Sequence, residues 1–155
     1  MIILGIDPGT VRVGYGVIKK DGGLSMLACG LVGDADKNTT DRLSHIGNEI
    51  KGLIKRFKPD AVGVEKVFFS KNKKTALAVA EARGVIVFTA GNMGIPVFEF
   101  SPTDIKSVVA GDGRCDKRTL ERIVCITLGE KSIDGPDDIS DALAVAIRTS
   151  FEFAK

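Results

Sequence analysis

The hydrophobic and polar positions along the chain follow two periods, and together they predict a mixed α/β fold. Short apolar runs predict strands at residues 2–7, 11–18, 24–31, 61–65 and 96–100. Apolar stripes at three- and four-residue spacing predict helices at residues 40–57, 74–91, 117–128 and 136–153, with another helix that Ser101 caps. Short turns join the first three strands and a helix precedes the fourth. We therefore expect an antiparallel meander followed by two parallel strands, flanked by helices.

The first strand ends in a carboxylate, Asp7, and the turn residues Pro8 and Gly9 follow it. A charge at the end of a buried strand is costly unless a metal ion or a partner compensates it. An aspartate before Pro-Gly is also an ordinary way to start a turn. On this stretch alone the two interpretations are evenly balanced.

Two further segments place acids where they can join Asp7. The fourth strand ends in Glu65, and the first turns of the last helix carry Asp138 and Asp141, which share one helix face. The helix dipole alone explains Asp137 well, but it explains Asp141 less well. Carboxylates from three segments can hold two divalent ions, which is the usual arrangement for phosphodiester hydrolysis. Oxygen ligands favour a hard ion such as Mg²⁺ or Mn²⁺.

Basic residues concentrate in two segments. Residues 66–74 contain four lysines, no acid and the adjacent Phe68 and Phe69, a composition suited to phosphates and bases. Residues 111–118 form a basic loop that enters a helix, but Asp116 stands where a P-loop needs glycine. Candidate phosphate contacts there are Arg114, Lys117, Arg118 and Arg122. The alternative for residues 66–74 is a solvated loop whose phenylalanines turn into the core, and for residues 111–118 it is a solvated helix start.

The composition limits the other function classes. A chain of 155 residues with 44% hydrophobic content predicts a single globular domain over residues 1–155. The net charge of +2 gives no global polycation. One histidine and three cysteines without a Cys-x-x-Cys pair argue against a zinc site and favour reduced thiols in the cytoplasm. No apolar run reaches 18 residues, so we expect no membrane span.

Taken together, these motifs resemble the RuvC family of bacterial Holliday-junction resolvases. The resemblance rests on Ile3–Thr10, Gly14–Val17, Glu65–Phe68, Lys71–Asn72, Ala82–Gly84, Pro96–Glu99, Lys106, Gly111, Gly113, Lys117 and Asp138–Ala144, in order over nearly the whole chain. It implies an RNase H-like fold and a homodimer that nicks opposing strands of a four-way DNA junction in recombination and repair. Expected partners are the junction DNA and the RuvA–RuvB branch-migration complex.

The resemblance also assigns residues. Asp7, Glu65, Asp138 and Asp141 match the family's catalytic positions and would hold two Mg²⁺ ions per subunit, with Mn²⁺ as a substitute. Phe68 matches the aromatic that stacks at the junction, and Lys106 and Lys117 match DNA-contacting lysines. The loop and helix starts add Lys71, Lys73, Lys74, Arg114 and Arg118 as expected DNA contacts. At Asp138 some relatives carry histidine, so the division of work between Asp138 and Asp141 stays open.

Three rival interpretations remain. A sugar-kinase or actin-like ATPase also begins with a strand, an acid and Gly-Thr, but it needs two such domains. An RNase H-like nuclease that acts on RNA, resembling the YqgF family, is disfavoured by Glu65, Phe68 and the pair of Asp138 and Asp141. A non-catalytic junction-binding protein is disfavoured by the presence of all four acids.

Overall fold

A five-stranded sheet forms the middle of the molecule in the computed structural model, which describes residues 1–33, 38–67 and 73–153. The strand order is β3-β2-β1-β4-β5. The strands are β1 (Ile2–Asp7), β2 (Val13–Lys20), β3 (Leu24–Val32), β4 (Ala61–Glu65) and β5 (Val97–Phe100). β1 lies at the centre of this order, so it is flanked on both sides and its apolar residues are buried on both faces.

The direction of the strands confirms the predicted mixed sheet. β1 pairs antiparallel with β2, which pairs antiparallel with β3. On its other side β1 pairs parallel with β4, which pairs parallel with β5. β1 and β4 therefore run in the same direction and end at the same edge of the sheet.

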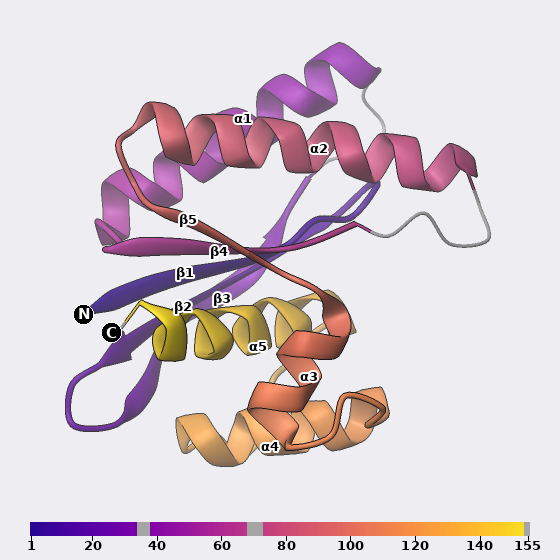
Figure 1. Ribbon diagram of the computed structural model, residues 1–155. Helices are drawn as coiled ribbons and strands as arrows, with labels where there is room; N and C mark the ends of the chain where they lie inside the picture. Colours follow the sequence, from indigo (N-terminus) through magenta and orange to yellow (C-terminus); the bar gives the residue numbers. More distant parts are fainter. Residues whose placement is uncertain (34–37, 68–72, 154–155) are drawn as a thin grey trace.

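Helices cover both faces of the sheet (Figure 1). On one face lie α1 (Thr39–Phe57) and α2 (Lys73–Asn92). On the other face α5 (Asp137–Glu152) packs directly on the strands, and α3 (Pro102–Ala110) and α4 (Lys117–Leu128) lie further out. In the described part of the chain, no helix is both long enough and apolar enough to span a bilayer.

Each face of the sheet has its own apolar core. The core on the α1 and α2 side includes Ile46, Ile50 and Ile54, which the stripe along residues 40–57 predicted to face inward. The core on the other side is built around Leu143 and Ile147 of α5. These two layers hold the sheet rigidly, which matters because the candidate site is built on strand ends.

Element boundaries differ from the sequence predictions by a few residues. The helix predicted from residue 40 begins at Thr39, and Asn38 caps it, because the Asn38 side-chain oxygen accepts a hydrogen bond from the Asp41 amide at 3.0 Å. β2 begins at Val13 rather than Val11, because Val11 and Arg12 belong to the turn that leaves β1. The predicted Ser101 cap of α3 and the predicted bounds of α4 are confirmed.

Candidate active site

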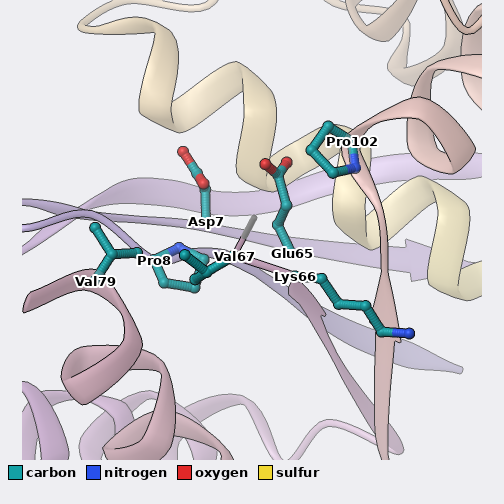
Figure 2. A pocket seen from close by; sticks show the side chains of 7 residues that line it. All are labelled: Asp7, Pro8, Glu65, Lys66, Val67, Val79 and Pro102. Atoms are coloured by element: carbon teal, nitrogen blue, oxygen red, sulfur yellow. The ribbon is translucent and has the colours of Figure 1, made fainter. Parts of the chain in front are cut away.

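Two carboxylates meet where β1 and β4 end. Because the parallel register pairs Ile6 with Val64, Asp7 and Glu65 are the next residues on neighbouring strands. Figure 2 shows both side chains on the same side of the strand ends, beside Pro102. They line a cavity of about 270 Å³ together with Pro8, Lys66, Val67, Val79 and Pro102. The convergence of strand-end acids that the sequence predicted is thus present.

A second cavity, of about 310 Å³, opens from the same two acids toward α5 and α4. Asp7 and Glu65 share it with Asp141, Lys106 and Lys117. Asp138 lines neither cavity, but its charge acts on Asp7, and its carboxylate lies 3.7 Å from the Arg12 guanidinium. All four predicted acids therefore lie at one edge of the sheet, three of them around one cavity.

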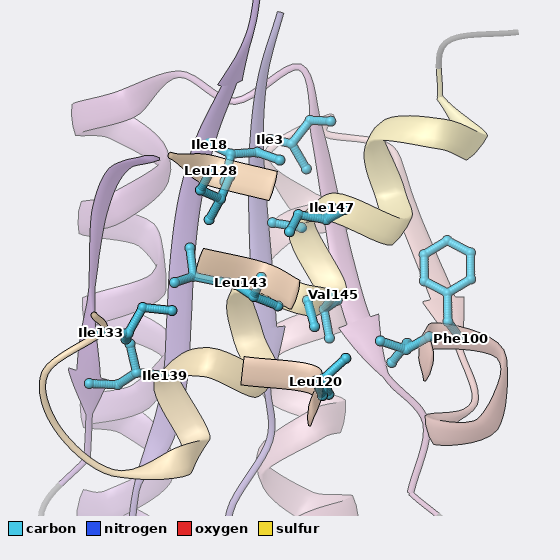
Figure 3. Close-up of a cluster of buried hydrophobic side chains, with 14 of the residues drawn as sticks. Ile3, Ile18, Phe100, Leu120, Leu128, Ile133, Ile139, Leu143, Val145 and Ile147 are labelled. Carbon is cyan, nitrogen blue, oxygen red and sulfur yellow. The ribbon is translucent and has the colours of Figure 1, made fainter. Parts of the chain in front are cut away.

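The position of Asp138 and Asp141 follows from how closely α5 lies on the sheet. Its inner side chains, among them Leu143 and Ile147, are buried against the strands (Figure 3). Glycines in the strands beneath α5 allow the helix backbone to approach the sheet closely. A Cβ atom on Gly5 would lie 2.2 Å from the Ala142 carbonyl oxygen, and one on Gly63 would lie 1.9 Å from the Thr149 hydroxyl. The helix start is thereby fixed beside the ends of β1 and β4.

Burial and mutual repulsion perturb the acids strongly. Burial, followed by the charges of Glu65, Asp141 and Asp138, raises the pKa of Asp7 to about 8. Burial and the charge of Asp141 raise the pKa of Glu65 to about 7. The pKa of Asp141 is also raised, mainly by burial, although Lys117 opposes that effect. The nearby lysines do not offset the burial and repulsion of these acids, which is a favourable electrostatic condition for cation binding.

Two lysines reach toward the acids. The Lys117 ammonium lies 3.0 Å from Asp137 and 3.6 Å from Asp141, and the hydrogen bond to Asp137 raises the pKa of Lys117. Lys106 donates to the carbonyl of Cys115 at 2.7 Å, which ties α3 to the loop before α4. From the sequence resemblance, both lysines were expected to contact DNA. The structure places them at the wall of the acidic cavity, where a phosphate would have to enter.

The donor set fits a hard divalent cation. Its members are carboxylates, the ligands that Mg²⁺ and Mn²⁺ prefer, and their pKa values are raised by burial and by mutual repulsion, both of which a bound cation would offset. Within residues 1–33, 38–67 and 73–153, no three Asp, Glu, His or Cys side chains are gathered closely enough to hold one ion together. A Mg²⁺ ion usually takes one or two carboxylates and keeps several waters, so Asp7 and Glu65 on neighbouring strand ends fit that demand.

The other predicted DNA contacts are only partly placed. Arg114 and Arg118 are exposed, at the loop before α4 and in its first turn. Phe68 and Lys71 lie outside the described residues. Lys73 and Lys74 begin α2, but their side chains also fall outside the described part.

Sequence reasoning missed two polar contacts of the site. Arg12 was given no role, yet it pairs with Asp138. Asp137 was explained by the helix dipole alone, yet it holds Lys117 at the cavity. Nothing in the local pattern signalled either contact, because each joins residues that are distant in the chain.

Comparisons with known proteins agree with this geometry. A family model described as "Crossover junction endodeoxyribonuclease RuvC" matches residues 3–149. A protein of that description from Chloroflexus aggregans is 44% identical over 149 residues, which cover 95% of this chain and 91% of that protein. Another, from Ruminiclostridium cellulolyticum, is 45% identical over 149 residues, covering 95% and 90%.

Solved structures give the same result. The structure of Thermus thermophilus RuvC matches with a TM-score of 0.91 at 30% identity, covering 99% of this chain and 96% of that one. T. thermophilus RuvC in complex with a Holliday junction substrate matches with a TM-score of 0.89 at 29% identity, with the same coverage. The similarity thus extends over the sheet, the helices and the strand ends that carry the acids.

Proposed function

Since the chain belongs to the RuvC family of crossover junction endodeoxyribonucleases, we propose that it resolves four-way DNA junctions by paired symmetric nicks in recombination and repair. The observation that carries this is the meeting of Asp7, Glu65 and Asp141 around one cavity, with Asp138 beside them. A relative of nearly the same fold was solved with a Holliday junction substrate. Residues 1–155 act as a single nuclease domain in this proposal.

The four acids are the proposed catalytic and metal-binding residues. Asp7 and Glu65 stand on strand ends at the rigid centre of the sheet, so they provide the fixed side of the site. Asp138 and Asp141 complete it from the first turns of α5. Two Mg²⁺ ions bound there would lower the pKa of an attacking water and neutralise charge on the phosphate, and Mn²⁺ would substitute.

Lys106 and Lys117 are proposed to orient the scissile phosphate. Both line the cavity that contains Asp7, Glu65 and Asp141, and both carry charge opposite to that of a phosphate. Lys117 is held at Asp137, so its ammonium is positioned before DNA arrives. An ammonium placed in advance loses less freedom on binding, which favours correct orientation of the substrate.

The remaining contacts lie further out. The exposed Arg114 and Arg118 extend the positive surface from the cavity toward the start of α4. On the basis of the sequence resemblance, Phe68 stacks at the junction, and Lys71, Lys73 and Lys74 bind phosphates near it. Phosphate contacts fix the register of DNA on a protein but carry no sequence information, so no cleavage sequence follows from these residues.

The active form is proposed to be a homodimer, because a four-way junction needs two opposing strands cut. α2 offers the surface for it. Leu77 is 61% exposed and Phe88 is 71% exposed on this helix, which otherwise packs mainly against α1. A groove between α1 and α2 is lined by Leu43, Val85 and Phe88, so an apolar side chain of a second copy has a place to insert.

The proposed setting is the cytoplasm, where the RuvA–RuvB complex would supply junctions.

A panel of nucleic acids tests the proposal. With Mg²⁺, a mobile four-way junction should be cut into two nicked duplexes that a ligase can seal, while linear DNA duplex and structured RNA of equal length stay intact. Equal cutting of linear duplex would contradict the proposal. Preferential cutting of RNA would favour an RNA-processing nuclease of the same fold. Binding of the junction without cutting in any divalent ion would leave only a junction-binding protein.

A further inference from the structure

Arg42 is a buried, charged side chain of α1 that contacts the turn following Asp7. Four polar side chains are buried in the described part of the chain. Ser140, Thr149 and Ser150 are hydroxyls that donate to backbone carbonyls of their own helix. Arg42, which is 8% exposed in the first turns of α1, is the charged one. A guanidinium is costly to bury, so its partners identify what it holds.

Those partners belong to two other segments. Nη1 of Arg42 donates a hydrogen bond to the backbone carbonyl of Thr10, three residues after Asp7. Nη2 lies 3.6 Å from the Glu81 carboxylate on α2. One guanidinium therefore joins α1, α2 and the turn between β1 and β2. Lysine cannot reproduce this arrangement, because an ammonium lacks the planar fork of donors.

The turn itself carries parts of the site at both ends. It begins at Asp7 and Pro8, which line the acidic cavity, and it ends at Arg12, which pairs with Asp138. It is also folded tightly, since a Cβ atom on Gly9 would lie 1.9 Å from the Arg12 carbonyl oxygen. Any shift of Thr10 would therefore also move Asp7 and Arg12, at the two ends of the turn. Arg42 provides the anchor at the middle of the turn.

We propose that Arg42 is a positioning residue for strand cleavage, which holds the turn of residues 8–12 in place and ties it to α2. This role rests on the proposed nuclease function. Arg42 is not placed to touch the phosphate, because it reaches the turn from the α1 and α2 side of the sheet. Its effect on cleavage passes through the backbone at Thr10 and, from there, to Asp7 and Arg12.

Amide hydrogen exchange in metal-free, DNA-free protein tests the anchoring directly. In Arg42→Lys, the amides of residues 9–12 should exchange about tenfold faster or more, while those of β1 and β4 stay unchanged. Glu81→Gln keeps the bond to Thr10 but loses the tie to α2, so it should show a smaller increase at the same amides. Arg56→Lys, an exposed change on the same helix, should show none. Unchanged exchange at residues 9–12 in Arg42→Lys would overturn the proposal.

Single-turnover cleavage then separates positioning from folding. Arg42→Lys should cut a four-way junction about 10- to 100-fold more slowly. Its Kd for the junction in EDTA should match that of the unsubstituted protein. The lost buried contacts lower its thermal unfolding midpoint, but the protein should stay fully folded at the assay temperature. A rate that falls only in proportion to lost binding or lost folded protein would refute the role. If the unsubstituted protein fails to cut junctions, the proposed function fails, and the exchange measurement still decides whether Arg42 holds the turn.

Discussion

Gly14 and Asp138 touch through their backbones. A Cβ atom on Gly14 would lie 1.9 Å from the carbonyl oxygen of Asp138, a distance that no side chain can accept. Gly14 pairs with Asp7 across the β1–β2 ladder. The missing side chain therefore lets the start of α5 lie directly beside the strand position that carries Asp7. In the sequence, Gly14 had no role beyond the family resemblance, and the structure gives it a role in assembling the site.

Gly14→Ala should reduce cleavage much more than it reduces the stability of the fold. The added methyl group must push the first turn of α5 away, which costs about 1–3 kcal/mol of folding free energy. A displaced Asp138 should slow junction cleavage by about 100-fold, measured under single-turnover conditions. Gly23→Ala is the control, because a Cβ atom there meets nothing within 4 Å. Equal rates for the two variants would contradict this explanation of the close approach.

Asp7→Asn should stabilise the metal-free protein at high pH. The folded-state pKa of Asp7 is raised to about 8, above its ordinary value of 3.8. Its contribution to stability is therefore complete below about pH 4 and is lost as pH rises through 8. At pH 8.5 in EDTA, urea unfolding should show Asp7→Asn more stable by about 2 kcal/mol, after allowance for solvent at this partly buried group. Near pH 4 the difference should vanish.

Two controls accompany the stability measurement. Mg²⁺ should reverse the order at pH 8.5, because it stabilises only the protein that keeps the carboxylate. Asp21→Asn should bring no gain at high pH, since Lys19 lowers the pKa of that exposed carboxyl. A pH-independent difference between Asp7→Asn and the unsubstituted protein would contradict a folded-state pKa of Asp7 raised by burial and by the neighbouring acids.

Phe88→Asp should weaken self-association. Phe88 is 71% exposed on α2, and losing its burial against a second copy removes about 2 kcal/mol, so the dimer Kd should rise about 30-fold or more. Ile126→Asp is a matched control on α4, where the side chain is 68% exposed. Sedimentation equilibrium of both variants checks this. Dissociation by Ile126→Asp alone would place the subunit contact on the opposite side of the sheet.

Arg118→Ala should lower the salt dependence of junction binding. If the exposed Arg118 neutralises one phosphate, the slope of log Kd against log salt should fall by about 1. Arg56→Ala, on the α1 side of the sheet, should leave the slope unchanged (Figure 1). A slope that does not change in Arg118→Ala would remove the start of α4 from the DNA-binding surface.

The predictions made from the sequence succeeded where local pattern and sheet topology decide the outcome. The strand-end position of Asp7 and Glu65 follows from two apolar runs that end in acids and from a crossover that makes the strands parallel. The stripe along α1 correctly predicted Ile46, Ile50 and Ile54 as core. Both inferences need only periodicity and the rules for connecting strands.

The predictions made from the sequence failed where a contact joins segments that are far apart in the chain. The pairing of Arg42 with Thr10 and Glu81 spans three elements, and nothing around Arg42 distinguishes it from a solvated helix residue. The same holds for Lys117 and Asp137, which meet only because α4 and α5 pack together. Gly14 was visible in the sequence, but its meaning depends on which helix lies above it.

The most direct test of the account compares the unsubstituted protein with Asp7→Asn on a mobile four-way junction. Both proteins are held above their Kd for the junction, in Mg²⁺, and nick positions are mapped on all four strands. We expect symmetric nicks on two opposing strands from the unsubstituted protein. In Asp7→Asn we expect undiminished binding with a rate at least about 1,000-fold lower. Cleavage by Asp7→Asn at an unchanged rate would contradict the assignment of Asp7 as the anchor of the site.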